Sequence, residues 1–458
     1  MATLCQRLMC IERWLREINH KAENHISIFD NLNIQIAGGL DISLPAMAKV
    51  EQTFAMAPIA DIETAVFSQI NRPDIAATIN EGANIAIGVG SRGIANLEVI
   101  VRATVEGIRK LGGHPFIFPA MGSHGGATAE GQAELLAGYG ITEARVGAPI
   151  RATMETVLVS TMSDGTELYM DKFAYEADGV VLINRIKPHT DFKGAIESGI
   201  IKMMVIGMGK IQGATMMHTD HGMISFAKTL PPAASQLMAH IPFLFGVGLV
   251  EDGYENTAVI EAISANQLIE REQILQAKAK QMMARLHFPE IDVLIIEKMG
   301  KDISGAGMDP NVIGRGTRAA YGFNSPKITK IVTLDLTEKT KGNATGVGLA
   351  DVITSRLFNK IDFEYTYANV ITSAYLDAGA IPLVMKTDKA AICLAVKTTP
   401  RVKPENARIV LIRDTLTLDK IYVSEPLLSI VAQDERLHQI GECRPLRFDV
   451  NGRLQLTN

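Results

Sequence analysis

The sequence is poor in the features that mark several large classes of protein. Only 5% of its 458 residues are aromatic, and its four cysteines, Cys5, Cys10, Cys393 and Cys443, form no CxxC pair. This spacing argues against a zinc finger or a disulfide scaffold and is typical of reduced thiols in a cytoplasmic protein. The formal charge of −5 offers no basic face to a phosphate backbone, so nucleic acid is not expected as a partner.

Long apolar runs are also missing. The N-terminal segment 1–25 contains charged side chains and no sustained apolar core, so we expect neither a signal peptide nor a membrane span there. Its apolar positions recur near helical spacing, which predicts an amphipathic helix. With 47% hydrophobic and 21% charged residues, the chain has the composition of a globular protein that needs no membrane partner. Oligomer formation is left open by these features.

Short apolar runs alternate with segments of helical periodicity along most of the chain. Runs at 84–87, 114–118, 180–183 and 291–296, each bounded by turn residues, are typical of buried parallel strands. The pattern predicts two α/β domains with mainly parallel sheets flanked by helices, and an active site in the cleft between them. The expected parts are an N-terminal appendage at 1–44, a catalytic domain at 45–288 and a C-terminal α/β domain at 289–458 that closes the cleft.

Polar residues crowd directly behind the apolar run at 180–183. The carboxyl ends of buried strands are where open α/β sheets place their ligands, so this loop is predicted to be functional. Its polar residues are Lys187, His189, Asp191, Lys193 and Glu197. By contrast, the polar face of a helix predicted at 266–286, which includes Glu270, Glu272 and Lys280, is predicted to be solvated.

Lys202 and His218 follow this loop, sixteen residues apart. The glycine, isoleucine, methionine and valine residues around Lys202 would desolvate its ammonium group and lower its pKa. Such a lysine can act as a nucleophile or carry a covalent adduct. A neutral imidazole at His218 could ligate a metal. Taken singly, a lysine that reaches solvent and a structural histidine remain open alternatives.

A glycine loop, Gly88-Val89-Gly90-Ser91-Arg92-Gly93, lies between a predicted strand and a predicted helix. This G-x-G-x-x-G pattern suggests dinucleotide binding, which also requires an acidic residue at the end of the next strand. The next strand, 114–118, ends in Pro-Ala-Met, so the acid is missing. Arg92 instead offers a guanidinium fork beside a helix N-terminus, where it could hold a carboxylate. A plain surface arginine remains the alternative.

His124 lies between glycines in the segment Gly122-Ser123-His124-Gly125-Gly126. An open, mobile backbone is a poor setting for a core histidine, so His124 is predicted to be functional. Ser123 does not form the nucleophile elbow of a hydrolase, because Met121 occupies the position where that elbow needs glycine.

The run His189, then Ser198-Gly199-Ile200-Ile201-Lys202, then His218, resembles the core of the nickel-dependent lactate racemase family. The enzymes of that family use a nickel-pincer nucleotide, of the nickel pyridinium-3,5-bisthiocarboxylic acid mononucleotide type. The resemblance implies that Lys202 bonds covalently to a thioacyl arm of this cofactor and that His218 ligates nickel. It also implies that His189 is an acid/base, although the interval from His189 to Lys202 is slightly longer than in the family.

Further residues take roles from the same resemblance. His124 matches the second acid/base histidine of the family, and Arg92 matches the arginine that holds the substrate. Ser198, Phe192 and Lys298 are expected to contact the cofactor. The loops 297–311 and 341–346, from the second domain, are expected to influence which substrate is bound.

The resemblance implies a racemase or epimerase of a small 2-hydroxy acid, which would act by hydride transfer to and from the lysine-tethered cofactor. The two histidines would exchange the hydroxyl proton, one for each enantiomer. Enzymes that build the cofactor are the implied protein partners. Two other functions stay open at this point. One is a zinc-dependent hydrolase or lyase that uses His218, Asp220 and His221, and the other is a cofactor-binding protein without turnover.

Overall fold

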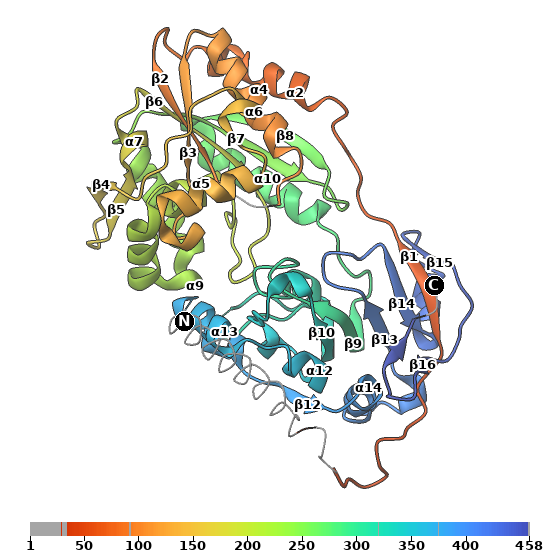
Figure 1. Ribbon diagram of the computed structural model, residues 1–458. Helices are drawn as coiled ribbons and strands as arrows, with labels where there is room; N and C mark the ends of the chain where they lie inside the picture. The colour runs from red at the N-terminus through yellow and green to blue at the C-terminus, as the bar shows by residue number, and fades with distance from the viewer. Residues whose placement is uncertain (1–28, 30–33, 91–92, 319, 374, 457–458) are drawn as a thin grey trace, which may run out of the picture. The chain divides into compact units, whose positions relative to one another are not determined.

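A computed structural model describes residues 29, 34–90, 93–318, 320–373 and 375–456, and the helix predicted for the segment 1–25 lies outside this part. The chain forms two compact units (Figure 1). Among the described residues, the five-stranded unit comprises those of Phe54–Arg285 and the short segment 320–322. The eight-stranded unit comprises the described residues up to Thr53, those of Leu286–Arg318 and those from Phe323 onward.

The five-stranded sheet has the order β3-β2-β6-β7-β8. The first four strands run parallel, and β8 is antiparallel to β7 at one edge. The strands are β2 (Asn84–Val89), β3 (His114–Pro119), β6 (Gly179–Arg185), β7 (Phe243–Glu251) and β8 (Thr257–Ser264). The apolar runs thus form parallel strands as predicted.

Both faces of this sheet are covered by helices. In β6, Val180 and Leu182 pack into one core, while Val181 and Ile183 pack into the core on the opposite face, as the alternation of side chains along a strand requires. The helices α2 (Ile62–Ile70) and α4 (Leu97–Lys110) cover the second of these faces, and α9 (Lys210–Met238) and α10 (Leu268–Met282) cover the first. The predicted α/β fold is confirmed.

Shorter elements complete this unit. The turn residues Asp164 and Gly165 predict a hairpin, and the structure forms one from the antiparallel strands β4 (Thr156–Thr161) and β5 (Glu167–Asp171). Helix α5 (Ala129–Gly138) begins after Thr128, whose side chain accepts a hydrogen bond from Gly131 N. The remaining short helices are α3 (Pro73–Ala76), α6 (Glu143–Val146) and α7 (Lys172–Tyr175).

The segment that carries Lys202 changes its helical form along its length. The short helix α8 (Ile200–Lys202) leads into a π-helical turn, Met203–Gly207, and then into α9. The sequence predicts an interruption at Pro231-Pro232, which is wrong. Helix α9 runs through both prolines, because the buried Phe226 and Leu230 hold it against the core just before them. The helix breaks instead at Gly222, with φ +64° and ψ 156°.

The eight-stranded sheet has the order β12-β11-β10-β9-β13-β14-β1-β15. Strands β12 through β13 are parallel, and the last three alternate in direction. The strands are β1 (Met47–Gln52), β9 (Glu290–Met299), β10 (Lys327–Leu336), β11 (Val352–Thr354), β12 (Leu383–Met385), β13 (Ile409–Ile412), β14 (Lys420–Ser424) and β15 (Leu437–Gln439). Strand β1, which falls within the predicted domain 45–288, therefore belongs to this sheet.

Helix α14 (Asp388–Lys397) packs on the eight-stranded sheet through residues such as Ile392 and Val396, which share a core with Ile295 of β9. The other helices of this unit are α11 (Pro310–Ile313), α12 (Ser355–Phe358), α13 (Phe363–Ser373) and α15 (Leu428–Val431). A small hairpin of β16 (Arg447–Phe448) and β17 (Leu454–Gln455) lies near the end of the described chain.

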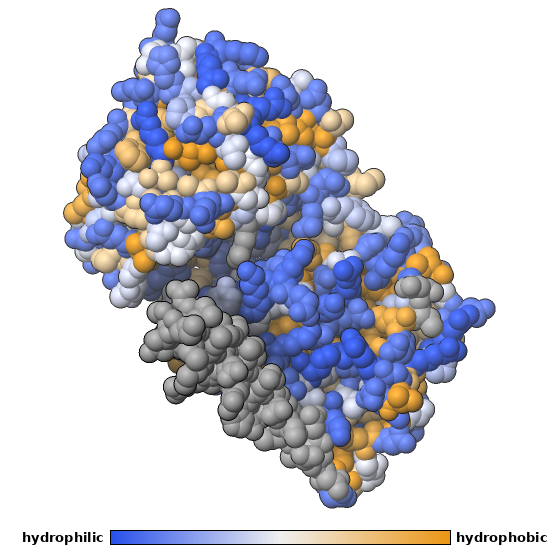
Figure 2. Space-filling model, in the orientation of Figure 1, coloured by the Kyte–Doolittle hydropathy of each residue, from blue (hydrophilic) through white to orange (hydrophobic). Residues whose placement is uncertain are grey.

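Hydrophilic side chains cover much of the visible surface, with hydrophobic ones scattered among them (Figure 2). Scattered exposed apolar residues are ordinary on protein surfaces. Among the described residues, no helix combines the length and the apolar character that crossing a membrane requires.

Candidate active site

Three loops leave the five-stranded sheet at one edge. Strands β3, β2 and β6 are adjacent and parallel, so the loops that follow them start at the same end of the sheet. These loops begin near Gly90, Ala120 and Ile186 and contain the predicted residues Arg92, His124 and His189. Arg92 lies outside the described residues, so its role stays a prediction.

The first two glycines of the G-x-G-x-x-G loop are required by packing. A Cβ atom on Gly88 would lie 2.9 Å from Cζ of Phe118, and one on Gly90 would lie 2.6 Å from the carbonyl oxygen of Ala120. Side chains at these positions would push β2 and its loop away from β3 and the loop that leads to His124. This close approach accounts for both glycines without a bound dinucleotide.

Glu197 organises the loop that carries His189. Its buried carboxylate accepts hydrogen bonds from the backbone N–H groups of His189, at 2.7 Å, and Gly194, at 3.0 Å. The ammonium group of Lys280, on α10, lies 2.6 Å from the same carboxylate. The sequence marks Glu197 only as one of several polar loop residues, and it predicts a solvated Lys280. Their pairing has no local signal, because the two residues are far apart in the chain.

His189 and Lys202 are in direct contact, with Nε2 of the imidazole 2.5 Å from Nζ of the lysine. Burial lowers the pKa of Lys202 to about 8; Asp191 opposes this shift, and the positive charge of Lys187 adds to it. The sequence predicts a lowered pKa at Lys202 from its apolar neighbours, and the structure agrees with that prediction.

Hydrogen bonding at His189 defines which nitrogen carries the proton. The backbone N–H of Asp191 donates to Nδ1 at 3.0 Å, so Nδ1 must be the unprotonated nitrogen. A neutral imidazole then carries its proton on Nε2, which donates toward the lone pair of Lys202 Nζ. We therefore assign this contact to a neutral imidazole and the amine form of Lys202, which a pKa of about 8 leaves as the minor form at neutral pH. If Lys202 were an ammonium group, both Nζ and Nε2–H would be hydrogen-bond donors, and neither atom could accept.

Both histidines near Lys202 are held in their neutral form. Burial, followed by the charges of Lys202 and Lys187, keeps the pKa of His189 well below its usual value. Burial, followed by the charge of Lys202, also lowers the pKa of His218. A neutral imidazole can take up a proton or offer a lone pair to a metal.

Two phenylalanines separate these histidines. Phe192 is fully buried and stacks on the ring of His189, with centroids 4.4 Å apart, and it meets Phe226 edge-on at 5.8 Å. The ring of His218 lies 5.0 Å from that of Phe226. Phe192 thus supports the ring of His189, and its predicted contact with a cofactor is not tested by the structure. The two phenylalanines give the site an apolar base that lowers hydration around Lys202.

Glu272 supports the start of the helix that bears Lys202. Its side chain is fully buried, and Oε2 accepts a hydrogen bond of 3.0 Å from the backbone N–H of Ile201. Burial raises the pKa of Glu272 to about 8. The prediction that Glu272 lies on a solvated helix face is wrong. The buried N–H groups at the start of α8 have no acceptor within the helix, and this carboxyl group accepts from them.

The structure does not test the roles of the other predicted residues. His124 is exposed in the loop after β3, and Ser198 is partly buried, with its carbonyl oxygen accepting a 2.9 Å hydrogen bond from Lys187 N. Lys298 is exposed near the end of β9 in the eight-stranded unit. The roles of all three remain predictions.

The residues of the zinc alternative are not gathered into a site. The imidazole of His221 lies 2.8 Å from the hydroxyl of Thr166, while His218 packs against Phe226. Asp220 is exposed. Across the described part of the chain, no three His, Cys, Asp or Glu side chains are grouped so that they could hold a metal ion. A metal here would need ligands from a bound molecule in addition to His218.

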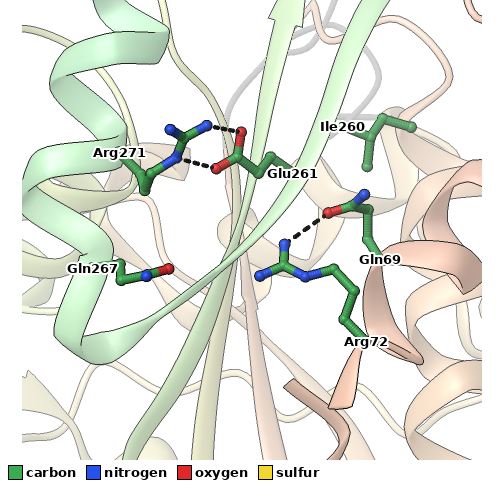
Figure 3. A pocket seen from close by; sticks show the side chains of 6 residues that line it. All are labelled: Gln69, Arg72, Ile260, Glu261, Gln267 and Arg271. Atoms are coloured by element: carbon green, nitrogen blue, oxygen red, sulfur yellow. Dashed lines mark hydrogen bonds and ion pairs between the residues drawn. The ribbon is translucent and has the colours of Figure 1, made fainter. Parts of the chain in front are cut away.

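The polar groups of an open pocket at another place in the five-stranded unit already pair with one another (Figure 3). Arg271 forms a two-point pair with Glu261, at 2.7 and 2.9 Å, and Arg72 donates to Gln69 Oε1 at 3.1 Å. Gln69 Oε1 also accepts a 3.2 Å hydrogen bond from the backbone N–H of Ala262, so these polar groups link α10, β8 and α2 and have a structural role. Its lining residues are Gln69, Arg72, Ile260, Glu261, Gln267 and Arg271.

The described residues form an α/β fold in which burial lowers the pKa values of Lys202, His189 and His218. Residues 37–229 match the family described as the lactate racemase N-terminal domain. This match places a region similar to the lactate racemase N-terminal domain in the first half of the chain.

Two solved structures are similar at low identity. One is the lactate racemase apoprotein from Thermoanaerobacterium thermosaccharolyticum, with a TM-score of 0.47 and 14% identity, over 81% of this chain and 99% of that chain. The other is a protein from Thermotoga maritima, with a TM-score of 0.42 and 10% identity, over 79% and 89%. Both scores are low, so neither likeness bears on the residues of the site. No curated protein sequence matches the chain.

Proposed function

We propose that this protein is a racemase or epimerase of a small 2-hydroxy acid, with a nickel-pincer nucleotide attached to Lys202. The family match supports a racemase-family function in general terms. The observation that carries the specific proposal is the contact between Lys202 Nζ and His189 Nε2, in a buried setting that lowers the pKa of Lys202 and so makes its amine form more accessible. A free amine is the form of lysine that can attack an activated acyl group.

The residues present fit the proposed cofactor in three respects. Lys202 supplies the nucleophilic amine for a covalent tether, and its lowered pKa keeps the amine available near neutral pH. His218 supplies one neutral imidazole, and its site offers no further group of protein ligands among the described residues. A metal whose remaining ligands come from the nucleotide needs only that one side chain. When bound, the cofactor would supply an acceptor and donor of hydride.

The protein's own residues would handle the proton and the orientation of the substrate. His189 is neutral, so its imidazole can take the hydroxyl proton of one enantiomer and return a proton in the reverse direction. His124, on the neighbouring loop, would do the same for the other enantiomer. Arg92 would hold the substrate carboxylate by a two-point hydrogen bond. Phe192 and Phe226 would help to exclude water from the reacting groups.

The proposal is tested by intact-mass analysis after co-expression with the enzymes that build the cofactor. The wild-type chain should gain the mass of the cofactor, and Lys202→Ala should lose that increment. Lys228→Ala provides a matched control, because Lys228 is an exposed lysine farther along α9. A mass increment that survives Lys202→Ala would refute this attachment site.

A chiral screen across small 2-hydroxy acids then tests turnover by the loaded protein. At least one pure enantiomer should be converted to a mixture, and the His189→Asn variant should convert it far more slowly. A loaded protein that isomerises none of these acids would contradict the proposed reaction and favour a cofactor-binding protein without turnover.

A further inference from the structure

Lys210 is a fully buried lysine that the proposed reaction does not use. It begins α9, midway in sequence between Lys202 and His218, and its side chain is 0% exposed. Its backbone adopts φ +53°, in the left-handed region that a residue with a side chain rarely occupies. Both the buried charge and the strained backbone are unfavourable, so the contacts of Lys210 must offset them.

The ammonium group of Lys210 joins three elements of the five-stranded unit. Nζ lies 2.9 Å from Oδ2 of Asp171, at the end of β5, and donates to Oε1 of Gln132, on α5, at 3.1 Å. It also donates to the carbonyl oxygen of Pro119, the last residue of β3, at 2.5 Å. Asp171 and Gln132 are themselves 0% exposed, so this is a buried polar network.

The same network continues into the loop at 120–127, which carries His124. The amide of Gln132 donates to the carbonyl oxygen of Gly122 at 2.8 Å and to that of His124 at 3.3 Å. Lys210 therefore holds the strand that precedes the loop, and it orients the amide that holds the loop itself. The chain of contacts runs from Lys210 through Gln132 to the backbone of His124.

A second contact ties this loop to the π-helical turn that follows Lys202. The backbone N–H of Gly122 donates to the carbonyl oxygen of Gly207 at 3.0 Å. Gly207 permits the approach, because a Cβ atom there would lie only 3.0 Å from the carbonyl carbon of Ala120. A π turn leaves carbonyl groups outside the regular helical pattern, and here one of them accepts from the loop.

We propose that Lys210 is a positioning residue that fixes the loop at 120–127, and with it His124, on the helix that carries Lys202 and His218. This inference rests on the proposed function for the role of His124, whereas the fixing of the loop does not depend on it. A lysine that served only to fill space could be replaced by methionine, which has a similar length and no charge. The three oxygen acceptors around Nζ argue that its hydrogen bonds are needed.

The test separates positioning from a merely structural ion pair. Lys210→Met leaves the carboxylate of Asp171 buried without its partner, so this variant should lose stability. The double variant Lys210→Met with Asp171→Asn has no unpaired charge, and an asparagine can still accept the hydrogen bond from Ala174 N that begins α7. The double variant should therefore recover most of the lost stability while the loop stays released.

Three measurements are made on wild type, both variants and the exposed control Lys228→Met. Urea unfolding gives stability, and hydrogen–deuterium exchange by mass spectrometry follows the peptide that contains residues 120–127. Racemisation kinetics of the cofactor-loaded proteins give kcat and KM. In the double variant we expect faster exchange of that peptide, kcat lower by roughly ten- to a hundredfold from misplacement, and KM little changed. Lys228→Met should match wild type in all three.

Two results would overturn the proposal. If the double variant regains wild-type kcat together with stability, the pair is merely structural. If exchange of the 120–127 peptide is unchanged in both variants, Lys210 does not fix the loop. A wild-type protein that racemises nothing would refute the proposed function instead, and the exchange measurement would still decide whether Lys210 holds the loop.

Discussion

Gly199 and Glu272 compete for the same space at the base of the site. A Cβ atom added to Gly199 would lie 2.7 Å from Cδ of Glu272, whose carboxyl group is held there by the N–H of Ile201. Gly199 has φ 178°, an extended conformation open to any residue, so the need for glycine is steric. Glycine is therefore needed at position 199, directly before α8, because of the side chain of Glu272, which lies far downstream in the chain.

This relationship predicts a coupled pair of substitutions. Gly199→Ala should lower the free energy of unfolding by about 1–3 kcal/mol, because the added methyl group must displace a carboxyl group from a tightly packed site. In a Glu272→Ala background the same change should cost clearly less, since the competing group is gone. Urea unfolding of the wild type, both single variants and the double variant measures the coupling. Equal costs in the two backgrounds would show that the two residues do not compete.

Glu272 also predicts a pH dependence of stability. Its pKa in the folded protein is about 8, above its ordinary value of 4.5, because burial disfavours the charged form. The folded state therefore binds more protons than the unfolded state between these values. Stability should fall as the pH rises from about 5 to 8, by up to about 1.4 kcal/mol per pH unit from this one group.

The Glu272→Gln variant should lack this decline. Urea titration at several pH values measures the free energies of unfolding of this variant and of wild type. The variant's value relative to that of wild type should increase as the pH rises toward 8, and the difference should then stay constant. Glu270→Gln is a matched control, because Glu270 is an exposed glutamate on the same helix. Parallel curves for wild type and Glu272→Gln would contradict the burial of a titrating carboxyl group.

Lys202 should react as an amine of unusually low pKa. With a pKa of about 8, its labelling by an amine-reactive reagent should reach half of its maximum near that pH, about two units below an ordinary lysine. Asp191→Asn should move this midpoint lower, because Asp191 stabilises the ammonium form. Lys187→Met should move it higher, because a repelling charge is removed.

Competitive labelling of the cofactor-free protein, followed by peptide mass spectrometry, gives these midpoints. Peptides that contain other lysines of the same sample serve as the internal control. A midpoint for Lys202 near 10.5 in the wild type would show that burial and Lys187 do not act on the amine as described.

The two histidines on α9 should differ in metal retention. In the cofactor-loaded protein, His218→Ala should reduce the nickel content per chain strongly, because the proposal assigns the only protein ligand to His218. His221→Ala should leave the nickel content unchanged, because the imidazole of His221 is hydrogen-bonded to Thr166. Elemental analysis of purified proteins, with protein concentration from amino-acid analysis, measures both. Equal losses in the two variants would favour a site that His218 and His221 share.

The sequence predicts the central sheet well because buried parallel strands are continuous apolar runs. The run at 180–183 is followed by a polar loop, and the structure places that loop at the edge shared with the ends of β2 and β3. The low pKa of Lys202 is predictable for a similar reason, since its apolar neighbours are adjacent in sequence. In both cases the residues that determine the structural feature are neighbours in sequence, so the sequence is enough to predict it.

The supports of the site are not predictable in this way, because each depends on a partner distant in the chain. Glu272 is on a helix with polar residues spread along it, and nothing near it in sequence shows that the N–H of Ile201 needs an acceptor. Glu197 pairs with Lys280, and Lys210 pairs with Asp171. Two adjacent prolines are stronger sequence signals for a helix break than Gly222. Helix α9 nevertheless breaks at Gly222 and continues through the prolines, where buried residues pack it against the core.

The place of β1 has a consequence for how the chain is made. This strand lies between β14 and β15, so a ribosome delivers it long before either of its neighbours. Every strand of the five-stranded sheet has been synthesised by Ser264. That sheet can therefore form during translation, while β1 has no neighbour until β14 emerges and keeps one edge unpaired until Leu437–Gln439 emerges. A nonsense mutation upstream of Lys420 would leave β1 permanently without neighbours, as an aggregation-prone strand attached to a folded unit.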